Sequence, residues 1–478
     1  MAAEPMFAWH RLTRRSAGPR PAGSRLAWRW LTVMIALQAP SWLWQMATGN
    51  LSFEERPLFN LDLVVAAIVA CFSTWLGLAA LGGAWIAEGL RAAAKNYHFM
   101  SVFDFVDAGR FASLLSLGQF VTVASVAAAA VLLLCAWTVL RQARGRPRLA
   151  LALAAALLVL PLLDGVNGSL RVAGLGADQS LVPMNVAGSP AWNILNGLRA
   201  GLYSDAAPRP SEDPAAFHRM RDWHAAHPGR SVLLVLVESM GLPRSSSLAA
   251  WLAGRLDTPA LRGRWRLSAG SEPFSGNTTS GELRVLCGLR GHYSRLTDAL
   301  AAGCLPAQWR RDGMTAAALH GFHLRMFDRR DWWPRIGLEP WNGRVREGSV
   351  PEVGCNRAFP GLCDRPLLRE AVAQAGEAPG RFIYALTLDT HLPVPTPAAP
   401  IDPVLATYCE DTRTPLTACE FVARVGGVLD TLAVELAASD ATPLVVVVGD
   451  HSPPFAERAN RDAFDPSRVP LFVLEPAP

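Results

Sequence analysis

The chain has 478 residues, enough for two or three domains, and 51% of them are hydrophobic. The formal net charge is +5, and much of the basic surplus lies in short segments beside apolar runs near the N-terminus. This distribution gives no reason to expect a nucleic-acid partner and is typical of membrane topology signals.

Residues 1–27 form a basic, arginine-rich segment with no small-residue cleavage site after the first apolar run. We therefore expect a cytoplasmic anchor segment rather than a removable signal peptide. Apolar runs follow at about 28–46, 61–87, 119–140 and 149–166. Each is close to the ~20 residues that cross a bilayer. The positive-inside rule places both residues 1–27 and the basic loop 141–148 in the cytoplasm.

With four spans, residues 1–27 and the loop 141–148 would lie on opposite sides of the membrane. A fifth crossing at about 99–117 would place both in the cytoplasm. That segment contains Asp104, Asp107 and Arg110, which are costly in lipid unless they are paired or face a polar cavity. The alternative is a re-entrant or interfacial helix in a four-span protein. The prediction is thus a transmembrane bundle over 28–166 with four or five spans, followed by an external C-terminal domain.

Residues 167–228 are rich in Gly, Pro and Asp with short amphipathic pieces, which predicts an interfacial linker. Over 229–478, apolar strand-like runs alternate with helical patterns. The predicted strands are 231–237, 315–320, 382–388, 443–448 and 470–474, and the predicted helices include 279–287, 365–375 and 420–438. This alternation predicts an α/β domain with a mostly parallel, helix-flanked sheet.

Six cysteines lie in this C-terminal part of the chain: Cys287, Cys304, Cys355, Cys363, Cys409 and Cys419. Their even number and close spacing predict the disulfides Cys355–Cys363, Cys409–Cys419 and Cys287–Cys304. A zinc cluster is the alternative, but no Cys-x-x-Cys pair is present. Disulfides persist in oxidising compartments, so the domain is expected outside the cytoplasm.

Two apolar strands end in potential metal ligands. The run 231–237 stops at Glu238, and the run 444–448 is followed by Gly449, Asp450 and His451. Ligands of open α/β sheets bind at the carboxyl ends of the strands, so these side chains are candidates for one metal site. The alternative for Glu238 alone is a residue that merely opens a loop.

Between these strands lies the stretch Ser275-Gly-Asn-Thr-Thr-Ser-Gly-Glu282, which predicts a helix N-terminus rich in hydroxyl groups. Anions are favoured at such a terminus. A hydroxyl beside a divalent metal can lose its proton and become a nucleophile. An ordinary capping box is the alternative interpretation.

Taken together, the Glu after the first strand, the Gly-x-Thr-x-x-x-Glu helix start and the late Gly-Asp-His resemble the alkaline-phosphatase/sulfatase superfamily. The most similar branch is that of the bacterial membrane transferases: lipoteichoic acid synthase, phosphoethanolamine transferases and phosphoglycerol transferases. Those proteins have a membrane bundle, an interfacial linker and an external α/β domain, so the resemblance covers nearly the whole chain.

The resemblance implies a divalent metal, Zn²⁺ or Mn²⁺, bound by Glu238, Thr278, Asp450 and His451. An oxygen and nitrogen ligand set suits either ion. It also implies that Thr278 is the nucleophile, because Thr278 stands four residues before Glu282. Thr279 is the alternative.

The resemblance further implies a substrate-side histidine at His391, which follows a predicted strand and could donate or accept a proton. Arg329 is expected to contact the phosphate or headgroup of the substrate. His320, His323 and Glu282 are further substrate-binding candidates. A surface charge role is the alternative for Arg329, with which Arg325 and Arg330 compete, and a structural role is the alternative for His391.

The predicted function is transfer of a phospholipid headgroup, phosphoethanolamine or phosphoglycerol, through a phospho-threonine to a glycan or lipid A-type acceptor. The protein is expected in the bacterial inner membrane as a multi-pass protein with a periplasmic catalytic domain. The chain lacks the Gly-Thr-Ser-Thr usual in phosphoethanolamine transferases, whereas its cysteines are more similar to theirs. The alternatives are a phosphodiesterase- or sulfatase-type hydrolase and an inactive, lipid-sensing relative.

Overall fold

A computed structural model describes most of the chain in two compact units. The residues described are 35, 37–39, 41–42, 57–96, 107, 109–111, 137, 140–141, 144–172, 186–195, 207–341, 355–356, 359–392, 400–455 and 457–477. The smaller unit comprises the described residues of Met1–Trp44, Phe53–Ala84 and Val131–Ser189. The larger unit comprises those of Gln45–Ser52, Trp85–Ala130 and Pro190–Pro478.

The smaller unit contains helix α2 (Leu61–Phe72) packed against α6 (Pro147–Val172), and the two-residue strands β1 (Phe59–Asn60) and β2 (Ala187–Gly188), which pair in parallel. The apolar run predicted at 61–87 is not one helix. Ser73 is extended and separates α2 from α3 (Thr74–Asn96). The Ser73 hydroxyl accepts a hydrogen bond from the Leu76 N–H at 3.5 Å, as a helix-capping side chain does.

Within the part of the chain that the structure describes, Pro147–Val166 alone is long and apolar enough to cross a membrane. The runs predicted at 28–46 and 119–140 lie largely outside the described residues. The bundle of four or five spans therefore stays a prediction.

The segment predicted as a fifth crossing is described only at residues 107 and 109–111, which belong to the larger unit. Asp107 is buried there and forms an ion pair with Arg110 at 2.7 Å. Asp107 also accepts a hydrogen bond from the Tyr293 hydroxyl at 2.7 Å, and Arg110 lies 3.3 Å from Asp328. Asp107 and Arg110 thus each have polar partners within the larger unit.

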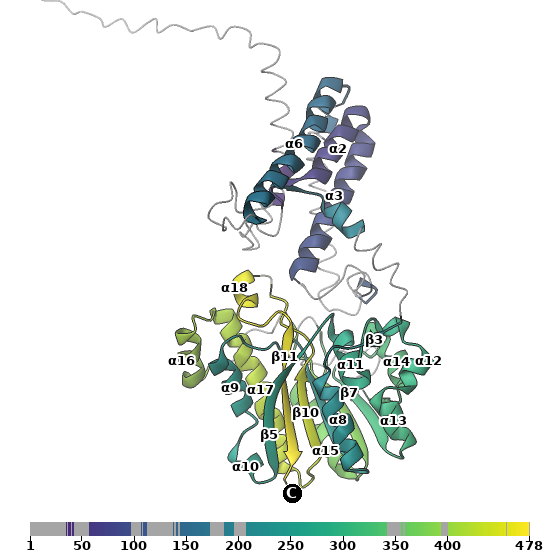
Figure 1. Cartoon of the computed structure of the whole chain (residues 1–478), viewed down its shortest axis with the longest axis vertical. Helices are drawn as coiled ribbons and strands as arrows, with labels where there is room; N and C mark the ends of the chain where they lie inside the picture. The colour runs from purple at the N-terminus through teal and green to yellow at the C-terminus, as the bar shows by residue number, and fades with distance from the viewer. Residues whose placement is uncertain are drawn as a thin grey trace, which may run out of the picture. The chain divides into compact units, whose positions relative to one another are not determined.

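A seven-stranded sheet forms the centre of the larger unit (Figure 1), in the order β5-β11-β10-β4-β9-β7-β8. The strands are β4 (Val232–Val237), β5 (Trp265–Pro273), β7 (Thr315–His320), β8 (Glu339–Trp341), β9 (Arg381–Leu386), β10 (Leu444–Gly449) and β11 (Arg468–Pro476). The neighbours from β10 to β8 are all parallel, whereas β11 is antiparallel to both β10 and β5. The predicted α/β domain is confirmed.

Alternate residues of the central strands face two separate cores. Leu233, Val235 and Val237 of β4 pack into a core with α9 (Ser246–Gly254), α15 (Asp364–Glu377) and α17 (Leu416–Ala438). The residues between them pack with α8 (Ala215–Ala226), α11 (Thr278–Cys287) and α13 (Leu305–Arg311). Figure 1 shows helices on both sides of the sheet. A strand buried on both faces has no polar alternation, which explains why these runs could be read from the sequence.

The helices of the larger unit have the following bounds: α8 (Ala215–Ala226), α9 (Ser246–Gly254), α10 (Pro259–Arg262), α11 (Thr278–Cys287), α12 (Asp298–Ala302), α13 (Leu305–Arg311), α14 (Arg329–Arg335), α15 (Asp364–Glu377), α16 (Pro403–Asp411), α17 (Leu416–Ala438) and α18 (Arg458–Arg461). Short elements complete it: strands β3 (Arg209–Pro210) and β6 (Leu289–Arg290) and the 3₁₀ turns η3 (Tyr293–Arg295) and η4 (Met326–Asp328).

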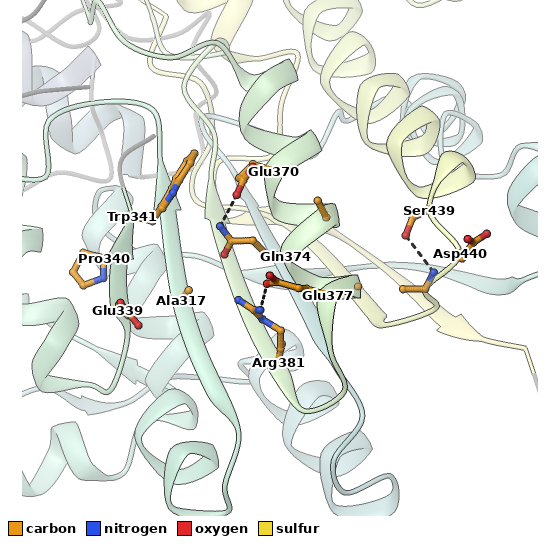
Figure 2. Close-up of a pocket in the computed structure, with 13 residues that line it drawn as sticks. Ala317, Glu339, Pro340, Trp341, Glu370, Gln374, Glu377, Arg381, Ser439 and Asp440 are labelled. Carbon is orange, nitrogen blue, oxygen red and sulfur yellow. Dashed lines mark hydrogen bonds and ion pairs between the residues drawn. The ribbon is translucent and has the colours of Figure 1, made fainter. Parts of the chain in front are cut away.

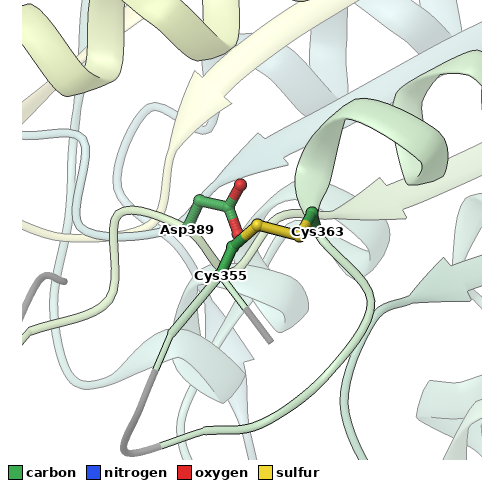
Figure 3. Close-up of side chains that lie close together, drawn as sticks. All are labelled: Cys355, Cys363 and Asp389. Atoms are coloured by element: carbon green, nitrogen blue, oxygen red, sulfur yellow. A yellow bond between two sulfur atoms is a disulfide. The ribbon is translucent and has the colours of Figure 1, made fainter. Parts of the chain in front are cut away.

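All three predicted disulfides are confirmed: Cys287–Cys304, Cys355–Cys363 and Cys409–Cys419. Figure 3 shows the second of these beside Asp389. Its two sulfur atoms are bonded to each other and are therefore not free to bind a metal together with Asp389. Cys71 is a buried free thiol in α2, and Cys135 lies outside the described residues.

Candidate active site

The adjacent strands β4 and β10 bring two carboxylate side chains and one imidazole together. Val237 is paired in register with Gly449, so the residues that follow, Glu238 and Asp450, lie side by side. The potential ligand atoms of Glu238, Asp450 and His451 all lie within 4.8 Å of one another. The His451 Nε2 atom is 3.6 Å from Glu238 Oε1 and 3.3 Å from Asp450 Oδ2. All three residues are buried.

Helix α11 adds a hydroxyl to this group. Thr278 is its first residue, after the N-cap Asn277, whose side chain accepts the Ser280 N–H. The Thr278 hydroxyl donates to Glu238 Oε2 at 3.2 Å and lies 3.5 Å from His451 Nε2. The neighbouring Thr279 is fully buried and donates to Asn277 Oδ1 at 2.7 Å. The structure thus brings Thr278 into the group and turns the Thr279 hydroxyl to the N-cap.

The donor atoms of this group fit a divalent cation. Asp450 Oδ1 accepts the N–H groups of Ser239 at 2.7 Å and His451 at 2.6 Å. Its other oxygen, Oδ2, is buried and accepts no hydrogen bond from the described residues. This oxygen lies 3.3 Å from His451 Nε2 without forming a hydrogen bond, and a buried carboxylate oxygen is costly without one. Two carboxylates, an imidazole and a hydroxyl form a donor set suited to Zn²⁺ or Mn²⁺.

Charge repulsion within the group supports the same interpretation. Burial and the nearby Asp450 carboxylate raise the pKa of Glu238 to about 8, although His451 opposes this shift. Two buried carboxylates at this distance are mutually unfavourable when ionised. A cation bound between them would remove that penalty.

Three residues that were not predicted from the sequence fix the position of Glu238. Ser239 has a positive φ of 56°, its hydroxyl donates to Glu238 Oε1 at 3.0 Å, and its N–H reaches Asp450. The Thr387 hydroxyl accepts the Glu238 N–H at 3.0 Å, and the Thr390 hydroxyl donates to the Glu238 carbonyl. The sequence signal that could have identified them is the presence of hydroxyl residues shortly after β4 and β9.

His391 lies at the edge of this group. Its Nε2 atom is 4.0 Å from Glu238 Oε1, and its side chain is 26% exposed, which leaves it accessible to a substrate. Its Nδ1 atom pairs with the Leu392 carbonyl at 2.7 Å, so that nitrogen carries the proton and Nε2 is free of one. Burial lowers the pKa of His391, which favours this neutral form. The neutral Nε2 can accept a proton.

Arg329 and Glu282 form a buried ion pair. The Arg329 Nε and Nη2 atoms lie 3.1 and 3.0 Å from Glu282 Oε2, and Nη1 donates to the Met326 carbonyl at 3.3 Å. Glu282 Oε1 accepts hydrogen bonds from Trp333 and Tyr384 at 2.9 and 3.1 Å. The described contacts of both side chains are therefore with protein groups, and their contact with substrate stays a prediction.

The two remaining histidine candidates differ in environment. His320 is buried at the end of β7, where its Nδ1 atom pairs with the Leu386 carbonyl at 3.1 Å. Burial and the Arg329 charge lower its pKa to about 3. His323 is partly exposed and stands edge-on to the Phe322 ring at 5.0 Å. A substrate contact for either stays a prediction.

The cavity of Figure 2 has a volume of about 680 Å³ and lies away from this group. Arg381, the first residue of β9, and Ala441, shortly before β10, both line it, which places it toward the amino ends of the strands. Glu238 and Asp450 follow the carboxyl ends. None of the predicted site residues lines this cavity.

No family model matches the chain, and no curated protein matches it. Solved structures do match. The lipoteichoic acid synthase LtaP from Listeria monocytogenes is 16% identical, with a TM-score of 0.37, over 58% of this chain and 71% of that one. The phosphoglycerol transferase GacH from Streptococcus pyogenes, in complex with sn-glycerol-1-phosphate, is 13% identical, with a TM-score of 0.36, over 56% and 77%.

The C-terminal periplasmic domain of EcEptC from Escherichia coli, in complex with Zn, is 14% identical, with a TM-score of 0.34, over 52% of this chain and 73% of that one. This chain is similar to all three structures.

Proposed function

We propose that this protein is a metal-dependent phosphotransferase that moves a phospholipid headgroup through a phospho-threonine. The observation that carries the proposal is the convergence of Thr278 with Glu238, Asp450 and His451 at the carboxyl ends of two adjacent strands. A threonine hydroxyl that donates to a carboxylate of a candidate metal site is well placed as a nucleophile.

Glu238, Thr278, Asp450 and His451 would hold the divalent cation, Zn²⁺ or Mn²⁺. When bound, that cation supplies positive charge, which lowers the pKa of a neighbouring hydroxyl and stabilises charge on phosphoryl oxygens. The N-terminus of α11 adds the favourable end of its dipole at Thr278.

The Thr278 oxygen attacks the phosphorus of the donor phosphodiester, and the bond from phosphorus to the diacylglycerol oxygen breaks. His391 receives the proton of the Thr278 hydroxyl at Nε2 and passes it to the departing diacylglycerol oxygen. An acceptor hydroxyl on a glycan or lipid A-type molecule then attacks the phospho-threonine diester. The bond from phosphorus to the Thr278 oxygen breaks, and His391 passes the proton of the acceptor hydroxyl to that oxygen.

We place the protein in the bacterial inner membrane with the catalytic domain in the periplasm. The three disulfides of the larger unit support an oxidising compartment. The helix stretch Pro147–Val166 supports membrane attachment. Phosphoethanolamine and phosphoglycerol remain the two headgroups that the motifs allow.

The test uses the full chain in detergent, loaded with Zn²⁺ or Mn²⁺ and given phosphatidylethanolamine or phosphatidylglycerol. We expect diacylglycerol release and a mass increment on the peptide that contains Thr278, which identifies the headgroup. The proposal would be contradicted if the metal-loaded protein showed neither diacylglycerol release nor a mass increment with phosphatidylethanolamine and with phosphatidylglycerol. Free headgroup released to water, with no transfer to an added glycan or lipid acceptor, would support a hydrolase instead. Lipid binding without turnover would support the sensing relative.

A further inference from the structure

Beneath the candidate metal centre lies a buried ion pair that none of the roles proposed above uses. Arg284 on α11 and Glu272 on β5 are joined by an Nε–Oε1 contact of 2.6 Å, and their side chains are 3% and 0% exposed. Burying a charged pair costs solvation free energy that the attraction between the charges does not reliably repay. We therefore interpret this ion pair as a group that fixes the geometry of the fold, rather than as a source of stability.

The rest of the Arg284 guanidinium is bonded to the carboxyl end of β10, which is followed by the candidate ligands Asp450 and His451. Nη2 donates to the Gly449 carbonyl at 2.7 Å, and Nη1 donates to the Asp450 carbonyl at 3.1 Å. Glu272 uses its second oxygen to accept the Ala216 N–H of α8 at 2.7 Å. One ion pair thus connects α8, β5, α11 and the carboxyl end of β10.

The same helix carries the proposed nucleophile. Thr278 and Arg284 are both on α11, and Gly281 between them lies directly against β10. A Cβ atom at Gly281 would come within 3.0 Å of Asp450 Cβ and 3.1 Å of Asp450 Cα. A side chain at residue 281 would therefore push the helix and Asp450 apart by a few tenths of an ångström. Arg284 then fixes the contact by holding two successive carbonyls.

We infer that Arg284 is a positioning residue of the metal centre. Anchored by Glu272, it holds the end of β10 against α11, so that the Thr278 hydroxyl and the Asp450 and His451 ligands converge. The inference rests on the proposed function in that it assumes these residues bind a divalent cation. Neither Arg284 nor Glu272 touches a predicted ligand atom.

The test measures metal affinity in the full chain in detergent, by competition for Zn²⁺ or Mn²⁺ with a chromogenic chelator. Arg284→Lys keeps the charge but loses the planar fork that reaches a carboxylate and two carbonyls at once. We expect its dissociation constant to rise about ten- to a hundredfold, the effect typical of residues that orient metal ligands.

Arg264→Lys is the matched control. The Arg264 guanidinium also donates to two carbonyls, those of Leu436 at 3.2 Å and Ala441 at 3.1 Å, but it lies near the amino end of β10. We expect this variant to lose thermal stability and keep the metal affinity of the unsubstituted protein. If Arg284→Lys behaves in the same way, the inference is wrong.

A second variant keeps the inference testable if Arg284→Lys does not fold. Glu272→Gln leaves the guanidinium and its carbonyl acceptors in place but removes the anchoring charge, so we expect a smaller weakening of metal binding. Unchanged affinity in Glu272→Gln would overturn the inference in that case. An unsubstituted protein that binds no Zn²⁺ or Mn²⁺ would overturn it outright. A protein that binds the metal and transfers no headgroup would contradict the proposed function while the Arg284 comparison still stands.

Discussion

The Thr278 hydroxyl donates a hydrogen bond to Glu238 Oε2 across 3.2 Å, although 40 residues separate them in the sequence. The adjacent hydroxyl of Thr279 makes a local bond to Asn277 instead. Two neighbouring threonines with the same chemistry therefore have different expected roles.

Thr278→Ala is expected to reduce headgroup transfer by on the order of a thousandfold or more, as loss of a nucleophile does. The mass increment on the peptide should disappear as well. Thr279→Ser keeps a hydroxyl for Asn277 and should retain most of the transfer rate. A Thr278→Ala protein that transfers headgroup at the unsubstituted rate would show that another group is the nucleophile.

Ser239 is expected to contribute to metal affinity through its hydroxyl and to cost backbone strain through its positive φ. Ser239→Ala removes the bond to Glu238 Oε1 and should weaken metal binding by about tenfold. Ser239→Gly should weaken it similarly, yet the metal-free protein should be about 1 kcal/mol more stable than Ser239→Ala, because Gly tolerates this conformation. Chelator competition and urea unfolding measure the two effects. Equal stability of the two variants would show that the strain is absent.

The Cys355–Cys363 disulfide is expected to position His391. Asn356 in this loop donates to the His391 carbonyl at 2.7 Å, and the Phe359 and His391 ring centroids are 3.9 Å apart. The double change Cys355→Ser and Cys363→Ser should slow transfer while metal affinity is kept, because no predicted metal ligand lies in the loop. Steady-state transfer rates and chelator competition on the same preparation measure both.

The Cys409–Cys419 disulfide provides the control, since its sequence separation of 10 is close to the 8 of the other bridge. Chain entropy predicts a stability loss of about 2–3 kcal/mol for either loop. Only the first double variant should also lose transfer activity. Equal transfer rates in the two variants, at equal stability, would argue against a specific effect on His391.

His320 should make the folded protein less stable as the pH falls. Its pKa is about 3 in the folded protein, against about 6.5 for an unperturbed histidine. Between these values the unfolded chain binds a proton that the native state does not. The free energy of unfolding should therefore fall from pH 6.5 downward, by up to about 1.4 kcal/mol per pH unit for this group.

His320→Gln keeps an N–H donor for the Leu386 carbonyl and removes the titration. Urea unfolding at pH 6.5, 5.5 and 4.5 should show a shallower loss of stability than in the unsubstituted protein. His323→Gln, at a partly exposed position in the loop that follows β7, is the control for the loss of an imidazole. Identical slopes for all three proteins would mean that His320 is protonated in the folded state.

The parts of the fold that could be predicted are those whose residues are buried on two faces. The run Thr315–His320 was predicted with the bounds that β7 has, and β4 and β10 were predicted to within one residue at each end. Strand β5 was missed because its outward residues include Arg266, Ser268 and Gly270, which carry no apolar pattern. Its partner β11 was predicted only in part, and its antiparallel direction has no local sequence signal.

The candidate site was predicted to the extent that its residues follow strands or begin a helix, as Glu238, Thr278 and Asp450 do. The partners of Glu282 could not be predicted, because they come from α14 and β9 through long-range packing. The same holds for Ser239, whose N–H meets a carboxylate 211 residues away.

The contact between Tyr293 and Asp107 bears on how this protein should be prepared for experiments. Phe111, from the same short segment, packs with Phe322, Met326 and Phe359, and the last of these rests on His391. A truncated protein that starts at residue 229 would lack this covering. An aromatic patch would then be exposed to water, and Tyr293 would keep only Asp328 of its two acidic partners. Such a fragment is expected to self-associate and to misreport proton transfer, so assays should retain the N-terminal half.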